Sequence, residues 1–304
     1  MAAQGGACSS YDQHGVHYCV TNGSVAAELR ASVFMRRSYS LAYLTVHQAT
    51  VSEAIEIASE LGYGYVGLRL QPNAPGAPHQ SFIHDSKAQS EALARMSDTG
   101  VRVFDLEIIR IGEQFNPASH LPLLEAGANL QARAVLVAAD DTNEERLAEN
   151  YAQLCEYMLP FGLTADLEFM PWTGVKDASS AMRVVEKAGR PKNSGILVDA
   201  LHFGRSTTRL ADIGKIPSDL LHYAQICDAQ RGLHFTNEEM IFHARQQRML
   251  PGEGTIDLAG LFASLPADIP VSVEIPNFIR SAQMGAKDWA KLALQTTKNL
   301  FDHQ

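Results

Sequence analysis

The stretch Gly195-Ile-Leu-Val-Asp199 places a carboxylate at the end of a short apolar run. Three further runs of the second half of the chain end in the same way, in a carboxylate or an amide: Ala165-Asp-Leu-Glu168, His222-Tyr-Ala-Gln225 and Val271-Ser-Val-Glu274. Aliphatic neighbours indicate burial, and a buried carboxylate is costly unless it is paired or bound to a cation. Four such positions on successive runs predict one shared site for a hard cation.

From residue 40 onward, short strand-like runs alternate with longer amphipathic segments. The strand-like runs are Leu41–Val46, Tyr63–Leu70, Val101–Ile109, Ala134–Ala139, Thr164–Phe169, Gly195–Leu201, Leu220–Cys227 and Ile269–Ile275. Helical patterns cover Val51–Leu61, Lys87–Ser97, Leu121–Ala132, Asn143–Leu159, Ala178–Ala188 and Ala286–Leu300. Eight strands with crossovers predict a single-domain (β/α)8 TIM barrel, which takes about 250 residues. An open doubly wound sheet is the alternative, because the number of strands does not prove closure.

The beginning of the chain has a different composition, rich in Gly, Ser and Ala, with no period of either kind. We expect residues 1–38 to be a disordered extension and residues 39–304 to form the barrel. A basic segment followed by an apolar core is lacking, which argues against a signal peptide. Met35 directly precedes the first strand-like run, so we hypothesise that translation starts there.

The bulk composition limits the class of partner. The chain has 304 residues, 46% of them hydrophobic, and a net charge of −9, which argues against a nucleic-acid partner. Apolar runs fall short of the roughly 18 residues that span a membrane. Four cysteines without CxxC spacing favour a reduced, cytoplasmic protein. We therefore expect a small-molecule substrate, with neither a membrane nor nucleic acid as partner; a homo-oligomer is compatible with the sequence.

The barrel prediction places the four polar residues at one end of the fold. Active sites of TIM barrels form at the C-terminal ends of the strands, where Glu168, Asp199, Gln225 and Glu274 stand. Their apolar neighbours suit the helix-facing side, which directs the four polar side chains inward. Oxygen donors favour Mg²⁺ or Mn²⁺ over Zn²⁺, and Co²⁺ and Zn²⁺ stay open as alternatives.

With these motifs the chain from residue 40 to about residue 301 resembles the xylose isomerase-like TIM barrels, which include sugar isomerases, ketose 3-epimerases and dehydratases. The resemblance rests on the four polar strand ends, on Asp199-Ala-Leu-His202 and on Leu250-Pro-Gly-Glu-Gly-Thr-Ile-Asp257. It implies a divalent metal held by Glu168, Asp199, Gln225 and Glu274. It also implies that Arg231, shortly after the strand-seven ligand, contacts substrate.

The resemblance further implies an isomerase or epimerase of a keto-sugar or related polyol. Glu168 and Glu274 would act both as ligands and as the bases that remove and return a proton next to a metal-bound carbonyl. Gln225 stands where most members of the family have a histidine. A glutamine at this position resembles the 3-dehydroshikimate dehydratases, so a lyase is an alternative function. A sugar-binding barrel without activity is a further alternative, whereas an AP endonuclease would need more histidines and a basic groove.

Six further residues are candidates for the site. His202 is expected to bind substrate or act as acid or base, or else to bond a loop carbonyl. Arg69 is a candidate contact for a substrate anion, and Trp172 a candidate apolar wall. Glu107 has either a role at the rim or an ion pair with Arg69 or Arg110. Arg245 and Arg248 either clamp a carboxylate or phosphate or form a solvated helix face.

Overall fold

The structure, a computed structural model, describes residues 37–302. The hypothesis about Met35 and nearly all of the expected extension concern residues outside this range, so they stay predictions. All of the strands and helices that follow lie within the described residues. The helices in this range are too short or too polar to cross a membrane.

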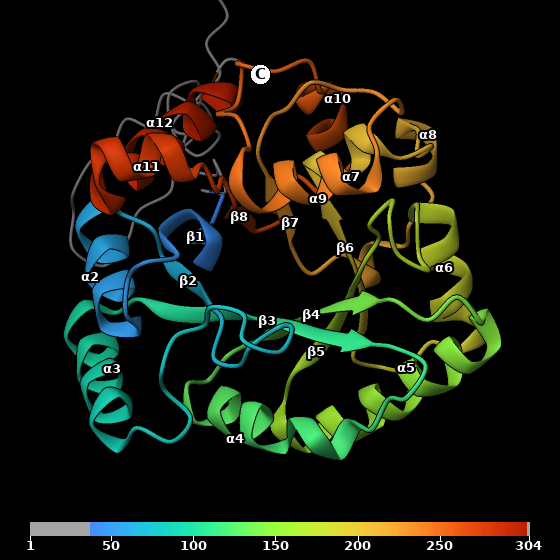
Figure 1. The fold of residues 1–304 in the computed structure, drawn as a ribbon, viewed down its shortest axis with the longest axis horizontal. Helices are drawn as coiled ribbons and strands as arrows, with labels where there is room; N and C mark the ends of the chain where they lie inside the picture. The colour runs from blue at the N-terminus through green and yellow to red at the C-terminus, as the bar shows by residue number, and fades with distance from the viewer. Residues whose placement is uncertain (1–36, 303–304) are drawn as a thin grey trace, which may run out of the picture. The chain divides into compact units, whose positions relative to one another are not determined.

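Eight parallel strands form a closed barrel in chain order (Figure 1). The strands are β1 (Tyr39–Leu41), β2 (Tyr65–Leu68), β3 (Arg102–Ile111), β4 (Ala134–Ala139), β5 (Thr164–Glu168), β6 (Ser194–Asp199), β7 (Ala224–Ile226) and β8 (Val271–Val273). Closure is direct, because β1 pairs with β8 and places Leu41 opposite Val273. The predicted TIM barrel is confirmed, and the open sheet is excluded.

Helices surround the barrel, and six of them match the amphipathic patterns of the sequence. These are α2 (Val51–Leu61), α3 (Ser86–Thr99), α4 (Leu121–Asn129), α5 (Glu144–Met158), α6 (Ala178–Lys187) and α12 (Ala286–Asp302). Five others lack a long amphipathic period and were not predicted: α7 (Ala200–Arg205), α8 (Leu210–Ile213), α9 (Asn237–Gln246), α10 (Leu258–Ala263) and α11 (Phe278–Met284).

Several predicted strands were too long at their ends. The first run splits, because Tyr43–Val46 turns into a 3₁₀ helix after β1. The sixth run was predicted through Leu201, but the strand ends at Asp199, whose side chain caps the start of α7. An apolar run shows burial but cannot show where a strand gives way to a buried helical turn.

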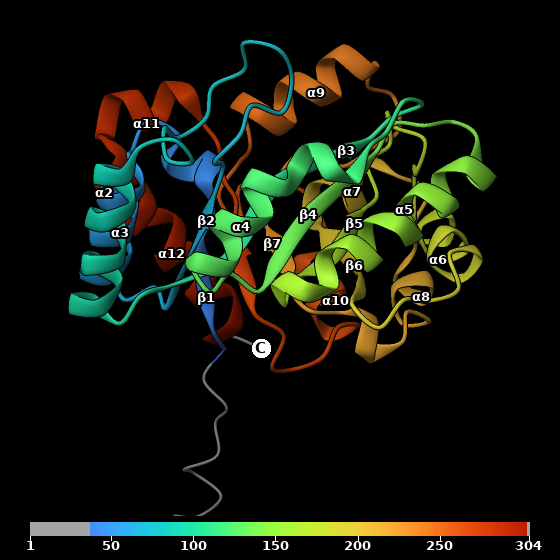
Figure 2. The same cartoon turned by 90° about the horizontal axis from the view of Figure 1, so that it is seen from below.

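Side chains fill the barrel as a packed core rather than a pore. One cluster inside the barrel contains Tyr65, Phe104, Leu136 and Tyr223, and it is closed at the strand ends by Met170. A larger cluster lies between the strands and the helices and includes the fully buried Trp289. The layers leave one end of the barrel for polar groups, and α9 lies across that end (Figure 2).

Candidate metal centre and active-site pocket

Asp199 joins β6 to α7 and holds both elements in place. Its Oδ1 accepts hydrogen bonds from the backbone N–H groups of Leu201, at 2.7 Å, and His202, at 3.2 Å. A carboxylate at this position satisfies N–H groups that the first helical turn leaves without partners. The turn that follows brings His202 back beside the strand ends, which explains why the spacing Asp-x-x-His places both side chains in one site.

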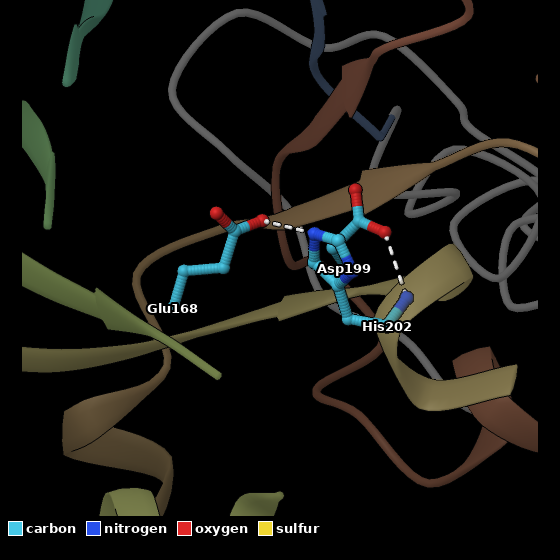
Figure 3. A group of neighbouring side chains, drawn as sticks. All are labelled: Glu168, Asp199 and His202. Atoms are coloured by element: carbon cyan, nitrogen blue, oxygen red, sulfur yellow. Dashed lines mark hydrogen bonds and ion pairs between the residues drawn. The ribbon is translucent and has the colours of Figure 1, made fainter. Parts of the chain in front are cut away.

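Glu168 comes from the neighbouring strand and lies against the same histidine. Its Oε1 is 3.5 Å from Nε2 of His202 (Figure 3). Glu168, Asp199 and His202 each offer a ligand atom, and these atoms lie within 4.8 Å of one another. All three residues are buried. They form a group that can hold a metal ion, and it includes His202, which the sequence predicted as a catalytic residue but not as a ligand.

Gln225 stands next to Asp199 in the barrel, because the two residues are register partners of β6 and β7. Its side chain is buried, and Oε1 has no hydrogen-bond partner among the described residues. A buried amide oxygen without a partner is unfavourable by about 1–3 kcal/mol. The oxygen is therefore available to a ligand that bonds to it.

Glu274 follows β8 and is tied to Asp199 through Arg248. Arg248 Nη2 lies 2.7 Å from Oε2 of Glu274, and Nη1 lies 2.5 Å from Oδ2 of Asp199. Arg248 Nε donates a hydrogen bond to the carbonyl of Ala244. Arg248 is only 2% exposed, so the interpretation of this residue as part of a solvated helix face is wrong. Its guanidinium is a buried cation shared by two carboxylates.

The pKa values of the carboxyl groups reflect an excess of negative charge in the site. Burial, together with Asp199 and Glu274, raises the pKa of Glu168 well above its usual range. Burial raises the pKa of Glu274 to about 8, although Arg248 acts in the opposite direction. Burial alone would raise the pKa of Asp199, but Arg248 and His202 outweigh it and lower this pKa. One guanidinium does not balance three buried carboxylates, so the site favours a further cation.

A pocket opens above these carboxylates, and Glu168, Glu274 and His202 contribute to its wall. Trp172 also lines it and packs edge to face on the His202 ring, with the centroids 5.0 Å apart. Arg69 and Glu107 line the pocket as well and form an ion pair of 2.5 Å. From the sequence, Glu107 was expected to have either a role at the rim or an ion pair with Arg69 or Arg110. The structure shows the ion pair with Arg69, and this pair also borders the pocket.

Arg231 does not share this pocket. It is exposed, after β7, and lines a different cavity together with Arg205. The structure therefore does not bring Arg231, the predicted substrate contact, beside Glu168 and Glu274. Arg110 and Arg245 line the first pocket instead, and Arg245 forms no ion pair with another described residue.

The sequence left the role of Arg248 open between a clamp for an anion and a solvated helix face, and it did not predict pairing with the carboxylates of the site. Arg248 lies in a polar stretch, Arg245-Gln-Gln-Arg248, where nothing distinguishes a buried arginine from an exposed one. Its partner Asp199 lies 49 positions earlier, so only the closed barrel reveals the contact.

Comparisons with known proteins give the family and the fold of the chain. A curated relative, the 3-dehydroshikimate dehydratase of Pseudomonas aeruginosa, is 27% identical over 203 residues, which cover 65% of this chain. The matched part spans only 29% of that protein. A solved structure of the IolI protein with a bound zinc atom has a TM-score of 0.69 at 19% identity, covering 86% of this chain and 97% of that one.

A D-allulose 3-epimerase from Methylomonas sp., solved in complex with D-allulose, has a TM-score of 0.62 at 16% identity. This match covers 87% of this chain and 97% of that chain. Likenesses at such identities show the fold alone. The model of the family described as the xylose isomerase-like TIM barrel matches residues 55–300. The chain therefore belongs to the xylose isomerase-like TIM barrel family.

Proposed function

We propose that this protein is a divalent-metal-dependent enzyme that removes a proton next to a carbonyl group of a small polyhydroxylated substrate. The observation that carries the proposal is the pair of buried carboxylates, Glu168 and Glu274, which line one pocket and have raised pKa values. A carboxylate of raised pKa is a stronger base than an ordinary one when it is ionised, and it keeps an accepted proton long enough to return it.

The residues present fit a divalent cation. Gln225 Oε1 is buried without a hydrogen-bond partner in the described part of the chain, and the carboxylates of Glu168, Asp199 and Glu274 exceed the charge that Arg248 supplies. His202 adds an imidazole nitrogen close to Glu168. Mostly oxygen donors favour Mg²⁺ or Mn²⁺, and the imidazole admits Zn²⁺ or Co²⁺ as well. We propose Glu168, Asp199, Gln225 and Glu274 as ligands. A bound cation would polarise a substrate carbonyl and acidify the adjacent C–H group.

The residues of the chain supply the remaining functions. Glu168 or Glu274 accepts the proton from carbon, and the other carboxyl group donates one. Burial lowers the pKa of His202 to about 4, so this ring is neutral at pH 7 and exchanges hydrogen bonds rather than acting as a cationic acid. Trp172 covers His202 and shields the pocket from water on that side. Arg69, held by Glu107, orients an oxygen of the substrate.

Two reactions start from this proton removal. Return of the proton to the opposite face or to the neighbouring carbon gives epimerisation or isomerisation. Dehydration instead uses the C–H electron pair to form a carbon–carbon double bond, while the β-hydroxyl group leaves with a proton as water. Isomerisation or epimerisation is the reaction that the resemblance of the sequence favoured. The structural similarity to a D-allulose 3-epimerase is compatible with it.

Dehydration of a carboxylate-bearing substrate is favoured by two other observations. Arg245 lines the pocket without an ion-pair partner among the described residues, whereas the neighbouring Arg110 is paired with Asp140 at 2.5 Å. Burial and the charges of Arg110 and Arg69 lower the pKa of Arg245, although Asp140 acts in the opposite direction. The curated relative is a 3-dehydroshikimate dehydratase, and the substrate of that enzyme carries a carboxylate. A neutral ketose would leave Arg245 without a partner.

The test is proton NMR in D₂O with Mg²⁺ present, using 3-dehydroshikimate, candidate ketoses and inososes. Formation of an aromatic product from 3-dehydroshikimate supports the dehydratase. Deuterium entering an α-carbon of a ketose or inosose supports the isomerase or epimerase. If all substrates stay unchanged and bind nonetheless, the barrel is a sugar-binding protein and the proposal fails. Arg245→Gln serves as a specificity control, because it should raise the KM of an anionic substrate about ten-fold and leave that of a neutral one unchanged.

A further inference from the structure

We propose that a second pocket, lined by Arg205, Arg231, His234 and His243, binds a small organic anion that carries a phosphate or carboxylate group. This cavity is formed by the segments that follow β6, β7 and β8, and it contains about 710 Å³. Ligand pockets of proteins usually measure about 300–1,000 Å³. The cavity therefore suits a metabolite rather than a single ion.

The second pocket is separate from the one above the carboxylates, because the two share no lining residue. The segment between α9 and the Pro251 turn divides them. It is extended, with bridges from Gln247 to Asn277 and from Met249 to Asp228. Successive side chains of an extended segment point to opposite sides. Arg248 accordingly lines the first pocket, whereas Gln247 and Met249 line the second.

Helix α7 contributes one residue to each pocket. His202, in its first turn, faces the carboxylates, and Arg205, at its end, faces the second cavity. A ligand on Arg205 would thus contact the same short helix that Asp199 caps.

Arg205 is the observation that points to an anion. The residue is only 4% exposed, and its Nε has no hydrogen-bond partner among the described residues. Its guanidinium lies on the ring of Phe235, 3.4 Å from the centroid, and Nη1 is 3.4 Å from Nδ1 of His243. It forms no ion pair within residues 37–302. A buried cation without a counter-charge is strongly unfavourable, so this arrangement lacks an anionic partner.

The charges around Arg205 are also positive in sum. Arg231 and Arg280 line the same cavity together with one acidic residue, Glu253, and Glu239 of α9 adds a second negative charge near Arg205. Glu253 is already paired with Arg280 at 2.6 Å. Arg231 forms no ion pair with another described residue, which leaves two guanidinium groups free. Guanidinium groups bind phosphate and carboxylate through pairs of parallel hydrogen bonds, which identifies the chemical class of the ligand.

The experiment is isothermal titration calorimetry of the full-length protein with inorganic phosphate and, separately, with malonate. The two probes distinguish a phosphate site from a carboxylate site. Each titration is performed on the protein as purified and after EDTA treatment, because phosphate also binds metal ions. The variants are Arg205→Met and Arg231→Gln. Lys192→Gln is the matched charge control, since Lys192 is exposed and does not line the cavity.

We expect saturable binding of at least one probe, weakened ten-fold or more by Arg205→Met and by Arg231→Gln and unchanged by Lys192→Gln. Arg231→Gln decides alone if the buried Arg205→Met variant does not fold. The proposal is overturned if neither probe binds saturably, if Arg231→Gln binds as well as the unaltered protein, or if EDTA abolishes binding. Loss of binding in Arg245→Gln would also overturn it, because that residue lines the first pocket.

Discussion

Arg248 and Asp199 form a buried ion pair, with Nη1 of the arginine 2.5 Å from Oδ2 of the aspartate. The same guanidinium contacts Glu274, so one cation joins the ends of β6 and β8. Both partners are buried, and each charge depends on the other for its stability in the interior.

Replacing Arg248 by Met should therefore destabilise the metal-free protein by about 3–5 kcal/mol, because two carboxylates then stay buried without a counter-charge. Chemical denaturation in the presence of EDTA measures this loss. Addition of Mg²⁺ or Mn²⁺ should recover part of it, since a bound cation supplies the missing charge. Arg245→Gln is the matched control in the same stretch and should change stability by less than about 0.5 kcal/mol. An equally stable Arg248→Met protein in EDTA would contradict the role assigned to the ion pair.

Glu274→Gln and Glu168→Gln each remove a carboxylate but keep the shape of the side chain. Each should lower kcat by about 100-fold or more, because an amide cannot accept the substrate proton. Solvent deuterium should stop entering the substrate, which NMR detects independently of net turnover. Glu253→Gln, a change outside this pocket, serves as the control for loss of one negative charge. Unchanged deuterium incorporation in both active-site variants would exclude these residues as the bases.

Gln225→His should shift the metal preference of the site from Mg²⁺ and Mn²⁺ toward Zn²⁺, since imidazole is a better ligand for zinc than an amide oxygen. Titration of EDTA-treated protein with each ion gives the affinities. We expect the ratio of zinc to magnesium affinity to rise about ten-fold or more, in line with the effect of a changed ligand. Gln225→Leu, which removes the unpartnered oxygen, should weaken binding of every ion. Equal affinities in all three proteins would show that Gln225 is not a ligand.

His222 provides a pH-dependent contribution to stability at the opposite end of the barrel strands. Its Nδ1 lies 2.7 Å from Oδ1 of the buried Asp166. Burial alone would lower the pKa of His222, but the bond and charge of Asp166 outweigh it and raise the pKa above its usual value. The folded state thus favours the protonated ring, so the stabilisation is complete below about pH 6 and is lost as the pH rises through the folded pKa.

The pH-dependent part of this stabilisation should amount to about 1–3 kcal/mol, as for other hydrogen bonds to charged groups. Denaturation of the unaltered protein and of His222→Gln at pH values from 5 to 9, about one unit apart, measures it. The difference between the two should be largest at the acidic end. His84→Gln, at an exposed histidine, is the control and should show no such trend. A difference in unfolding free energy between the two proteins that grows with pH would contradict the stabilising role of protonated His222.

The close approach of these two side chains also explains Gly195. A Cβ atom at this position would lie 2.3 Å from Oδ1 of Asp166 and 2.6 Å from Nδ1 of His222. The sequence shows only a glycine at the start of a strand, where it usually weakens pairing. The need for glycine comes from Asp166 and His222, which are 29 and 27 positions away in the chain and are brought together by the barrel.

The repeating pattern of apolar runs and amphipathic segments was sufficient to predict eight strands that alternate with helices, because burial on one side imposes a period that survives in any tertiary context. Closure of the sheet rests on the pairing of β1 with β8. The pattern was also sufficient to place Glu168, Asp199, Gln225 and Glu274 at one end, since parallel strands all end on the same side. Helix α7 escaped prediction because its 6 residues are too few to show a period, and α9 escaped because it buries only Met240 and Ala244 and so has little apolar pattern.

The sequence by itself therefore determined the order of strands and helices and the end of the strands that carries the polar residues, whereas closure of the sheet was seen only in the structure. Only the tertiary structure decided that Arg248 is buried between Asp199 and Glu274, that His202 joins Glu168, and that Arg231 faces a different pocket from them. The physical reason is the range of the interactions. Periodicity is encoded among neighbours in the chain, whereas a buried charge is defined by partners that only closure of the barrel brings within a few ångströms.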